Sequence, residues 1–127
     1  MADKKRMFIS FAVEDKWARD YLVGQAKNEK SPFEFVDMSV KEPWDSEWKK
    51  RCRTKIKGCD GVIAILSKNS AKADGEKWEM KCADEEGVPM IGIWAKKDEQ
   101  VTVPAEFGKN KVIEWTWAGI AKFIDSL

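Results

Sequence analysis

The sequence predicts a doubly wound α/β fold of the flavodoxin-like type, a parallel five-stranded sheet in a single domain over residues 1–127. Apolar runs alternate with amphipathic stretches along the chain, a pattern typical of strands that alternate with helices. The run Val62–Leu66 has five consecutive apolar residues, which is typical of a central strand buried on both faces. A chain of 127 residues suits one hydrophobic core rather than two.

The first elements are predicted from an apolar run and a helical repeat. Residues 7–11 read Met-Phe-Ile-Ser-Phe and are expected to form a strand. Residues 14–27 follow as a helix, with Trp17 and Tyr21 at helical spacing. A Ser-Pro turn then precedes a second strand over residues 33–37.

The middle of the chain begins with a basic helix. Asp45 or Ser46 is expected to cap it, because short polar side chains accept hydrogen bonds from the first free amides of a helix. The helix runs to about Lys57, and Gly58 ends it. A strand over residues 61–67 follows, and it contains the apolar run described above.

The second half of the chain continues the alternation. A helix over residues 76–86 ends at a glycine, and a strand is predicted over residues 90–94. Residues 111–114 suit a short edge strand, and residues 118–127 a closing helix. Right-handed connections between parallel strands then favour the strand order 2-1-3-4-5.

Composition excludes several classes of function. The absence of histidine removes Ser-His-Asp and Cys-His catalysis and histidine-ligated zinc or haem. The net charge of +1 gives no general attraction to nucleic acid or to a membrane surface. Three cysteines without a CxxC pair, and no stretch typical of a signal peptide or membrane span, indicate a cytoplasmic protein. No metal and no resident cofactor are expected.

A ligand site is expected where the fold usually holds one. In a sheet of this order, ligands bind at the carboxyl ends of the strands, between the first and third strands. The segments there are residues 11–15, 38–44 and 67–75, and neither GxGxxG nor a P-loop motif occurs in the chain. Aromatic rings can stack on a base, and hydroxyl groups can hold ribose or phosphate. Each candidate ligand contact, taken singly, also suits an ordinary loop residue. The candidates are Phe11, Trp44, Ser67, Asn69 and Ser70, with the start of the helix at Glu76.

One carboxylate falls on the apolar face of the helix over residues 76–86. With Glu76 set at zero and about 100° per residue, Glu79 lies at roughly 300°, between Cys82 and Ala83. A carboxylate in mid-helix on an apolar face is costly unless it is paired or used. Glu79 therefore either bonds a loop amide or a lysine for structural reasons, or faces the predicted crevice and contacts a sugar there.

The order of motifs resembles the TIR-like (Toll/interleukin receptor) family. FISF with EDK, at residues 8–11 and 14–16, is similar to the opening of TIR domains. The segment VIAILSKNS, residues 62–70, resembles the strand and loop in the middle of the TIR pattern. KWEMKCADEEGVPMIGIW, residues 77–94, resembles the helix with the catalytic glutamate and the strand after it. The chain is most similar to small TIR-like proteins, including those of Thoeris anti-phage systems.

The resemblance implies an enzyme that consumes NAD as a substrate. Glu79 corresponds to the catalytic glutamate that supports cleavage of the nicotinamide–ribose bond, with Glu76 as a rival because the usual Trp-Cys pair before the glutamate is missing. The resemblance places nucleotide contacts at Ser10 and Phe11 and, in the loop that often covers the cofactor, at or near Asp37 and Trp44. Ser67 and Asn69 are expected to join them from the place of the crevice in the fold. Candidate partners are NAD or a related nucleotide, a second copy of the chain and an effector protein that senses the product; nucleic acid and membrane are not expected.

A second class of function stays open from the sequence. The same fold serves as a non-catalytic interaction module in signalling, in which surface residues contact another protein. Seven tryptophans are many for this length, and they are most simply placed in the core. Trp17, Trp48, Trp78 and Trp94 lie inside predicted elements and are expected to fill the core or a groove.

Overall fold

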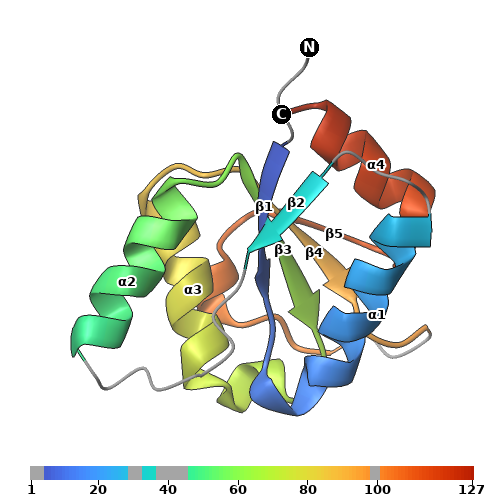
Figure 1. The fold of residues 1–127 in the computed structure, drawn as a ribbon. Helices are drawn as coiled ribbons and strands as arrows, with labels where there is room; N and C mark the ends of the chain where they lie inside the picture. The colour runs from blue at the N-terminus through green and yellow to red at the C-terminus, as the bar shows by residue number, and fades with distance from the viewer. Residues whose placement is uncertain (1–4, 29–32, 37–45, 98–100) are drawn as a thin grey trace.

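The computed structural model describes residues 5–28, 33–36, 46–97 and 101–127, and within them the chain forms the expected α/β fold (Figure 1). The strands are β1 (Lys5–Ser10), β2 (Phe33–Val36), β3 (Gly61–Leu66), β4 (Met90–Trp94) and β5 (Lys111–Ile113). The helices are α1 (Lys16–Asn28), α2 (Ser46–Lys57), α3 (Asp74–Glu85) and α4 (Trp117–Asp125). Three short 3-10 helices are η1 (Val13–Asp15), η2 (Ser70–Lys72) and η3 (Ala105–Phe107).

The sheet has the predicted topology. The five strands pair in the order β2-β1-β3-β4-β5, and each neighbouring pair is parallel. Ile63 of β3 pairs with Ile9 of β1 on one side and with Ile91 of β4 on the other. All six residues of β3 are buried, as expected for a central strand covered on both faces.

Helices cover both faces of the sheet in two layers. In Figure 1, α2 and α3 lie on one side and α1 and α4 on the other. Because side chains alternate along a strand, Phe8 of β1 packs into the core on the α2 and α3 side. Met7 and Ile9 pack with Leu22 of α1 and Ile120 of α4 in the second core. This alternation also decides which way the residues at the end of β1 point.

Several element boundaries differ from the sequence prediction by one or two residues, and two of them are helix starts. The helix expected from Glu76 begins at Asp74, because the N–H of Lys77 already donates to the carbonyl of Ala73 at 2.9 Å. The helix expected from Glu14 begins at Lys16, since Val13–Asp15 form the tighter turn of η1. Both differences lie in the first turn, where helices commonly change geometry.

Of the two places expected for Trp17, the core or a groove, the structure excludes the core. Its side chain is 49% exposed, and Tyr21, one turn later, is 64% exposed. The buried stripe of α1 consists of Ala18, Leu22 and Ala26, four residues apart. Trp17 and Tyr21 belong to the adjacent stripe, so they lie beside the sheet contact rather than in it. Trp48, in contrast, is buried as predicted.

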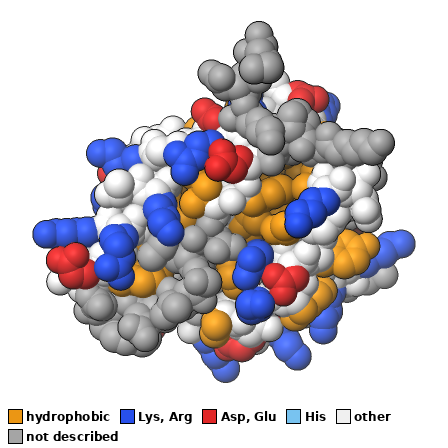
Figure 2. Space-filling view, viewed as in Figure 1, with side chains coloured by type: hydrophobic (Ala, Val, Ile, Leu, Met, Phe, Trp, Pro, Cys, Tyr) orange, Lys and Arg blue, Asp and Glu red, His pale blue; other side chains and the backbone are white. Residues whose placement is uncertain are grey.

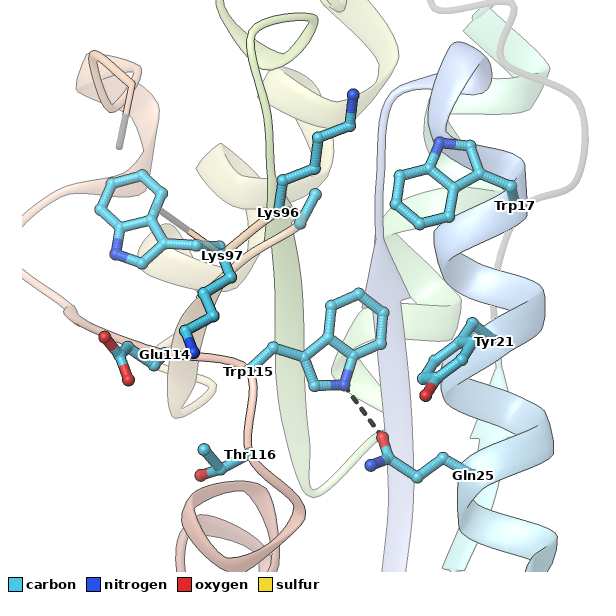
Figure 3. A pocket seen from close by; sticks show the side chains of 10 residues that line it. Trp17, Tyr21, Gln25, Lys96, Lys97, Glu114, Trp115 and Thr116 are labelled. Carbon is cyan, nitrogen blue, oxygen red and sulfur yellow. Dashed lines mark hydrogen bonds between the residues drawn. The ribbon is translucent and has the colours of Figure 1, made fainter. Parts of the chain in front are cut away.

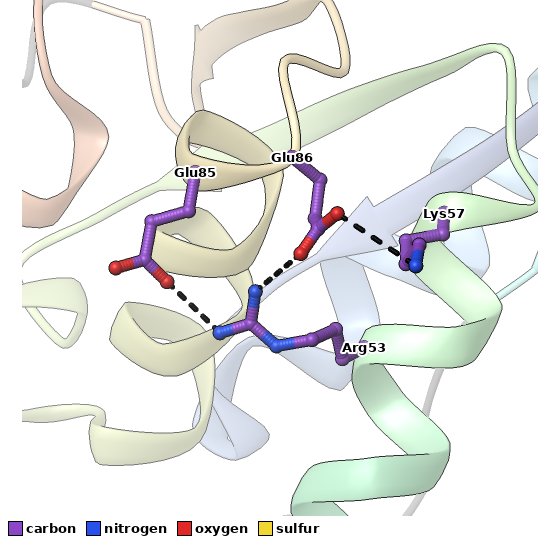
Figure 4. A network of polar contacts seen from close by, with 4 residues as sticks. All are labelled: Arg53, Lys57, Glu85 and Glu86. Atoms are coloured by element: carbon purple, nitrogen blue, oxygen red, sulfur yellow. Dashed lines mark hydrogen bonds and ion pairs between the residues drawn. The ribbon is translucent and has the colours of Figure 1, made fainter.

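The basic face of α2 is a solvent-exposed surface tied to α3. Figure 2 shows Lys and Arg side chains gathered over α2, at the left of the view. Arg53 donates to Glu85 at 2.9 Å and to Glu86 at 2.6 Å, and Lys57 approaches Glu86 at 3.9 Å (Figure 4). The bonds to both glutamates raise the pKa of Arg53 above its ordinary value. These contacts account for part of the basic run without a nucleic-acid partner.

No helix within the described residues is both long enough and apolar enough to span a membrane.

Candidate functional site

The carboxylate of Glu79 is buried and held by the end of β1. Its side chain has no exposed surface, which agrees with its place on the inward face of the predicted helix. The hydroxyl of Ser10, the last residue of β1, donates to Oε1 of Glu79 at 2.8 Å. Ser10 is also fully buried, because the alternation along β1 directs it toward α3. The hydrogen bond orients the carboxylate at the carboxyl end of a central strand.

Glu76 lies one turn earlier on the same helix and is equally buried. The helical wheel placed it at the border of the inward face, whereas the structure leaves none of its surface exposed. The hydroxyl of Ser10 lies 3.4 Å from the backbone oxygen of Glu76. The end of β1 thus meets the backbone of Glu76 and the carboxylate of Glu79 on one face of α3. Burying two acidic side chains here costs stability, which favours a functional use of this face.

A polar network joins the loops that follow β1 and β3. Asp15 of η1 is only 2% exposed, and its carboxylate accepts a short hydrogen bond from the hydroxyl of Ser67. The side-chain amide of Asn69 donates to the other carboxylate oxygen at 3.0 Å. The backbone N–H of Asn69 donates to the Ser67 hydroxyl oxygen, also at 3.0 Å. Two predicted ligand contacts, Ser67 and Asn69, therefore lie together at the predicted crevice, bonded to Asp15.

Sequence reasoning placed Asp15 in a crevice segment but assigned it no role. Its position five residues after β1 offers no local pattern that distinguishes it from the exposed Glu14 beside it. The partner residues come 52 and 54 positions later in the chain. Only the pairing of β1 with β3 brings them together.

Phe11, a further predicted ligand contact, is not brought to Glu79. Phe11 is buried in the core formed with α1 and α4, on the far side of the sheet from α3. The Arg19 guanidinium lies 5.7 Å from the centroid of the Phe11 ring. Asp37 and Trp44 lie outside the described residues, so their expected role in covering the cofactor stays a prediction.

The thiol nearest to Glu79 along the helix is poorly suited to nucleophilic chemistry. Cys82 is fully buried, and burial raises the pKa of its thiol to about 11. The thiolate is the reactive form, so a raised pKa keeps the thiol protonated near neutral pH. Within the described part of the chain, no group of three or more Cys, Asp and Glu residues could hold a metal ion.

Comparisons with known proteins agree with this architecture. A family model described as "Thoeris protein ThsB, TIR-like domain" matches residues 8–100. The solved structure of a prokaryotic SEFIR domain is similar with a TM-score of 0.56 and 15% identity, covering 97% of this chain and 89% of the other. The SEFIR domain of IL-17 receptor B gives a TM-score of 0.62 and 8% identity, covering 98% and 96%. At these identities the two structures establish the fold alone. No curated protein matches the chain significantly.

Proposed function

The chain belongs to the family of TIR-like domains of the Thoeris protein ThsB, and on that premise we propose that it is an NAD-consuming enzyme. The proposed reaction cleaves the nicotinamide–ribose bond and gives an ADP-ribose-type signalling nucleotide, linear or cyclic, in anti-phage immunity. The observation that carries the proposal is the fully buried carboxylate of Glu79, held at 2.8 Å by Ser10 at the end of a central strand. That edge of the sheet is where doubly wound folds bind ligands.

The proposed chemistry needs few functional groups. When the bond between ribose C1′ and the pyridinium nitrogen breaks, its electron pair leaves with nicotinamide, which becomes a neutral pyridine and needs no general acid. Positive charge develops on the ribose, and the Glu79 carboxylate would stabilise that oxocarbenium-like centre. Water, or another nucleophile of the substrate, then attacks C1′ and loses a proton. The absence of histidine is compatible with each of these steps.

Other residues would position the substrate in this proposal. The bond from Ser10 limits the orientations of the Glu79 carboxylate, and a fixed orientation lowers the reorganisation cost of catalysis. The network of Asp15, Ser67 and Asn69 would hold the two crevice loops at a fixed spacing. Contacts of NAD with Asp37 and Trp44 remain part of the proposal, whereas Phe11, buried on the opposite face of the sheet, is left out of it.

The experiment that tests the proposal compares the wild-type protein with Glu79→Gln at high NAD concentration. Release of nicotinamide is followed by chromatography, and adenine-containing products are identified by mass. Glu79→Gln keeps the shape of the side chain and is expected to abolish turnover. Asp84→Asn, which removes an exposed carboxylate of the same helix, serves as the matched control and is expected to retain it. Equal turnover in Glu79→Gln would contradict the assignment.

The alternative is a non-catalytic interaction module, and exposed apolar side chains favour it. Val13, Trp17 and Tyr21 are each about half exposed or more. Exposed aromatic residues are typical of surfaces that bind proteins. In this case Glu79→Gln would leave binding to a partner, or to a second copy of the chain, unchanged. An absence of both turnover and an NAD-induced thermal shift would favour the module, whereas binding without turnover would indicate that an activator is required.

A further inference from the structure

A pocket of about 470 Å³ lies away from Glu79, between α1 and the ends of β4 and β5 (Figure 3). Trp17, Tyr21 and Gln25 of α1 form one wall. The opposite wall consists of the segment after β4, up to Lys97, and the segment after β5, residues 114–116. Both segments follow the carboxyl ends of parallel strands, where folds of this type bind ligands.

Four of the ten residues that line this pocket are aromatic. Three of the seven tryptophans of the chain and its single tyrosine contribute to it. Trp17 and Tyr21 keep about half or more of their surface exposed, although aromatic surface is favourably removed from water. The pocket volume lies in the range of sites for small molecules. These faces therefore suit a planar ring that stacks against them.

The central ring of the pocket is held in place without a ligand. The indole N–H of Trp115 donates to Oε1 of Gln25 at 2.9 Å, as Figure 3 shows. The ring of Tyr21 meets the Trp115 ring edge-on, with centroids 5.6 Å apart and planes at 86°. Contacts from two successive turns of α1 thus fix the indole. A rigid aromatic wall reduces the ordering cost of binding.

Charged groups at the rim indicate the charge of the ligand. Lys96 and Lys97 are exposed, and Figure 3 shows them diverging from the end of β4. Among the described residues that line the pocket, Glu114 is the single acidic one, so the two ammonium groups outnumber it. Ammonium groups bind phosphate or carboxylate, and the Glu114 carboxylate can accept a hydrogen bond from an N–H or O–H of a ligand.

We propose that this pocket binds a planar aromatic ring that carries an anionic group, such as a nucleotide or an aromatic acid. The ring stacks beside Trp17 and Trp115, and the anionic group pairs with Lys96 and Lys97. The site is separate from Glu79, which lies on α3 against the opposite face of the sheet. Binding in this pocket does not require that the protein cleaves NAD.

Calorimetric titration of the full chain tests the proposal with four probes: adenosine monophosphate, adenosine, indole-3-acetate and inorganic phosphate. The two anionic aromatic probes distinguish a nucleotide source from an aromatic acid. At least one of these two probes is expected to bind. Adenosine should bind more weakly, and binding of phosphate alone should be undetectable. Trp17→Ala, at a position outside the core, is expected to weaken binding about tenfold, the scale of one lost stacking contact.

Charge variants separate the anionic contact from the stacking contact. The double variant Lys96→Ala/Lys97→Ala is expected to weaken binding of the anionic aromatic probe several-fold and to leave the affinity for adenosine unchanged. Lys50→Ala/Lys55→Ala, two exposed lysines of α2, is the matched control and should bind as the wild type does. Glu79→Gln should also bind normally, whatever its effect on NAD.

Three results would overturn the proposal. The first is no binding of any aromatic probe at millimolar concentration. The second is binding that Trp17→Ala and the Lys96/Lys97 variant leave unchanged, or that Glu79→Gln removes, because the ligand then lies elsewhere. The third is an absence of probe binding together with self-association that Trp17→Ala abolishes, which would make this face a protein interface.

Discussion

Ser10 and Glu79 are 69 residues apart in the chain, yet the hydroxyl of one donates to the carboxylate of the other at 2.8 Å. The bond connects the end of β1 to the middle of α3, and both side chains are fully buried. It is a polar contact inside a core that otherwise consists largely of apolar side chains. A contact of this kind both secures α3 to the sheet and directs the carboxylate toward the carboxyl ends of the strands.

Ser10→Ala is expected to destabilise the protein by about 1–3 kcal/mol, the cost of removing one partner from a buried hydrogen bond to a carboxyl group. Urea denaturation measures the change. Ser126→Ala, which removes an exposed hydroxyl that bonds a carbonyl within its own helix end, should cost less than about 0.5 kcal/mol. Equal losses in the two variants would show that burial of the Ser10 bond adds nothing to stability.

Asp15→Asn is expected to cost about 1–3 kcal/mol, because one accepting oxygen becomes an NH₂ group, so that either the Ser67 hydroxyl or the Asn69 amide loses its acceptor. Glu14→Gln makes the same change in charge at an adjacent exposed position and should lie within about 0.5 kcal/mol of the wild type. The midpoint of thermal unfolding in the same buffer compares the two. If the two variants unfold at the same temperature, the network does not support the crevice loops.

The pair of Arg53 and Glu85 predicts a pH-dependent contribution to stability. The hydrogen bond from Arg53 holds the pKa of Glu85 below its ordinary value of 4.5. A carboxylate whose folded pKa is depressed contributes stability above its unfolded pKa and loses it as the pH falls through the folded value. The melting temperature of Glu85→Gln should therefore lie below that of the wild type at neutral pH, and the difference should shrink as the pH falls through the folded pKa of Glu85.

Asp84→Asn, an exposed neighbour on α3, is the control for this measurement. The effect of Glu85→Gln should be small, since the side chain of Glu85 is 47% exposed and solvent screens the pair. High salt should reduce it further. A difference that grows as the pH falls would have the wrong sign and would reject the explanation.

Replacement by alanine is expected to have opposite effects on stability at two glycines, Gly92 and Gly24. A Cβ on Gly92 of β4 would lie 2.9 Å from atoms of both Leu66 and Phe107, which are buried, so Gly92→Ala is expected to cost about 1–3 kcal/mol. A Cβ on Gly24 of α1 meets nothing within 4 Å. Gly24→Ala should therefore stabilise the helix by about 0.5–1 kcal/mol. Chemical denaturation of both variants checks the contrast, and a loss of stability in Gly24→Ala would contradict it.

The fold was predictable because its signals are local. An unbroken apolar run identifies β3, and the positions of Gly58 and Gly87 fit the helix ends. A chain whose helices alternate with short strands has few right-handed arrangements, and the order β2-β1-β3-β4-β5 is among them. The inward direction of Glu79 also follows from local geometry, since the helical repeat sets its angle relative to the apolar residues around it.

Side-chain partners were not predictable in the same way. The periodicity of α1 is compatible with a buried or an exposed Trp17, because Trp17 and Ala18 begin adjacent stripes on the same helix. No sequence pattern shows that Asp15 is buried and that its neighbour Glu14 is exposed. The aromatic pocket combines residues of α1 with segments after β4 and β5, which no spacing in the sequence connects.

The sequence by itself determined the layers, the strand order, the family and the inward place of Glu79, because each depends on periodicity or on motifs within short segments. Only the tertiary structure decided that Ser10 holds Glu79, that Asp15 joins Ser67 and Asn69, and that Trp17 lines a pocket. The physical reason is the same in each case. Partners come from distant elements, and their contact depends on how strands pair and how a helix turns against the sheet.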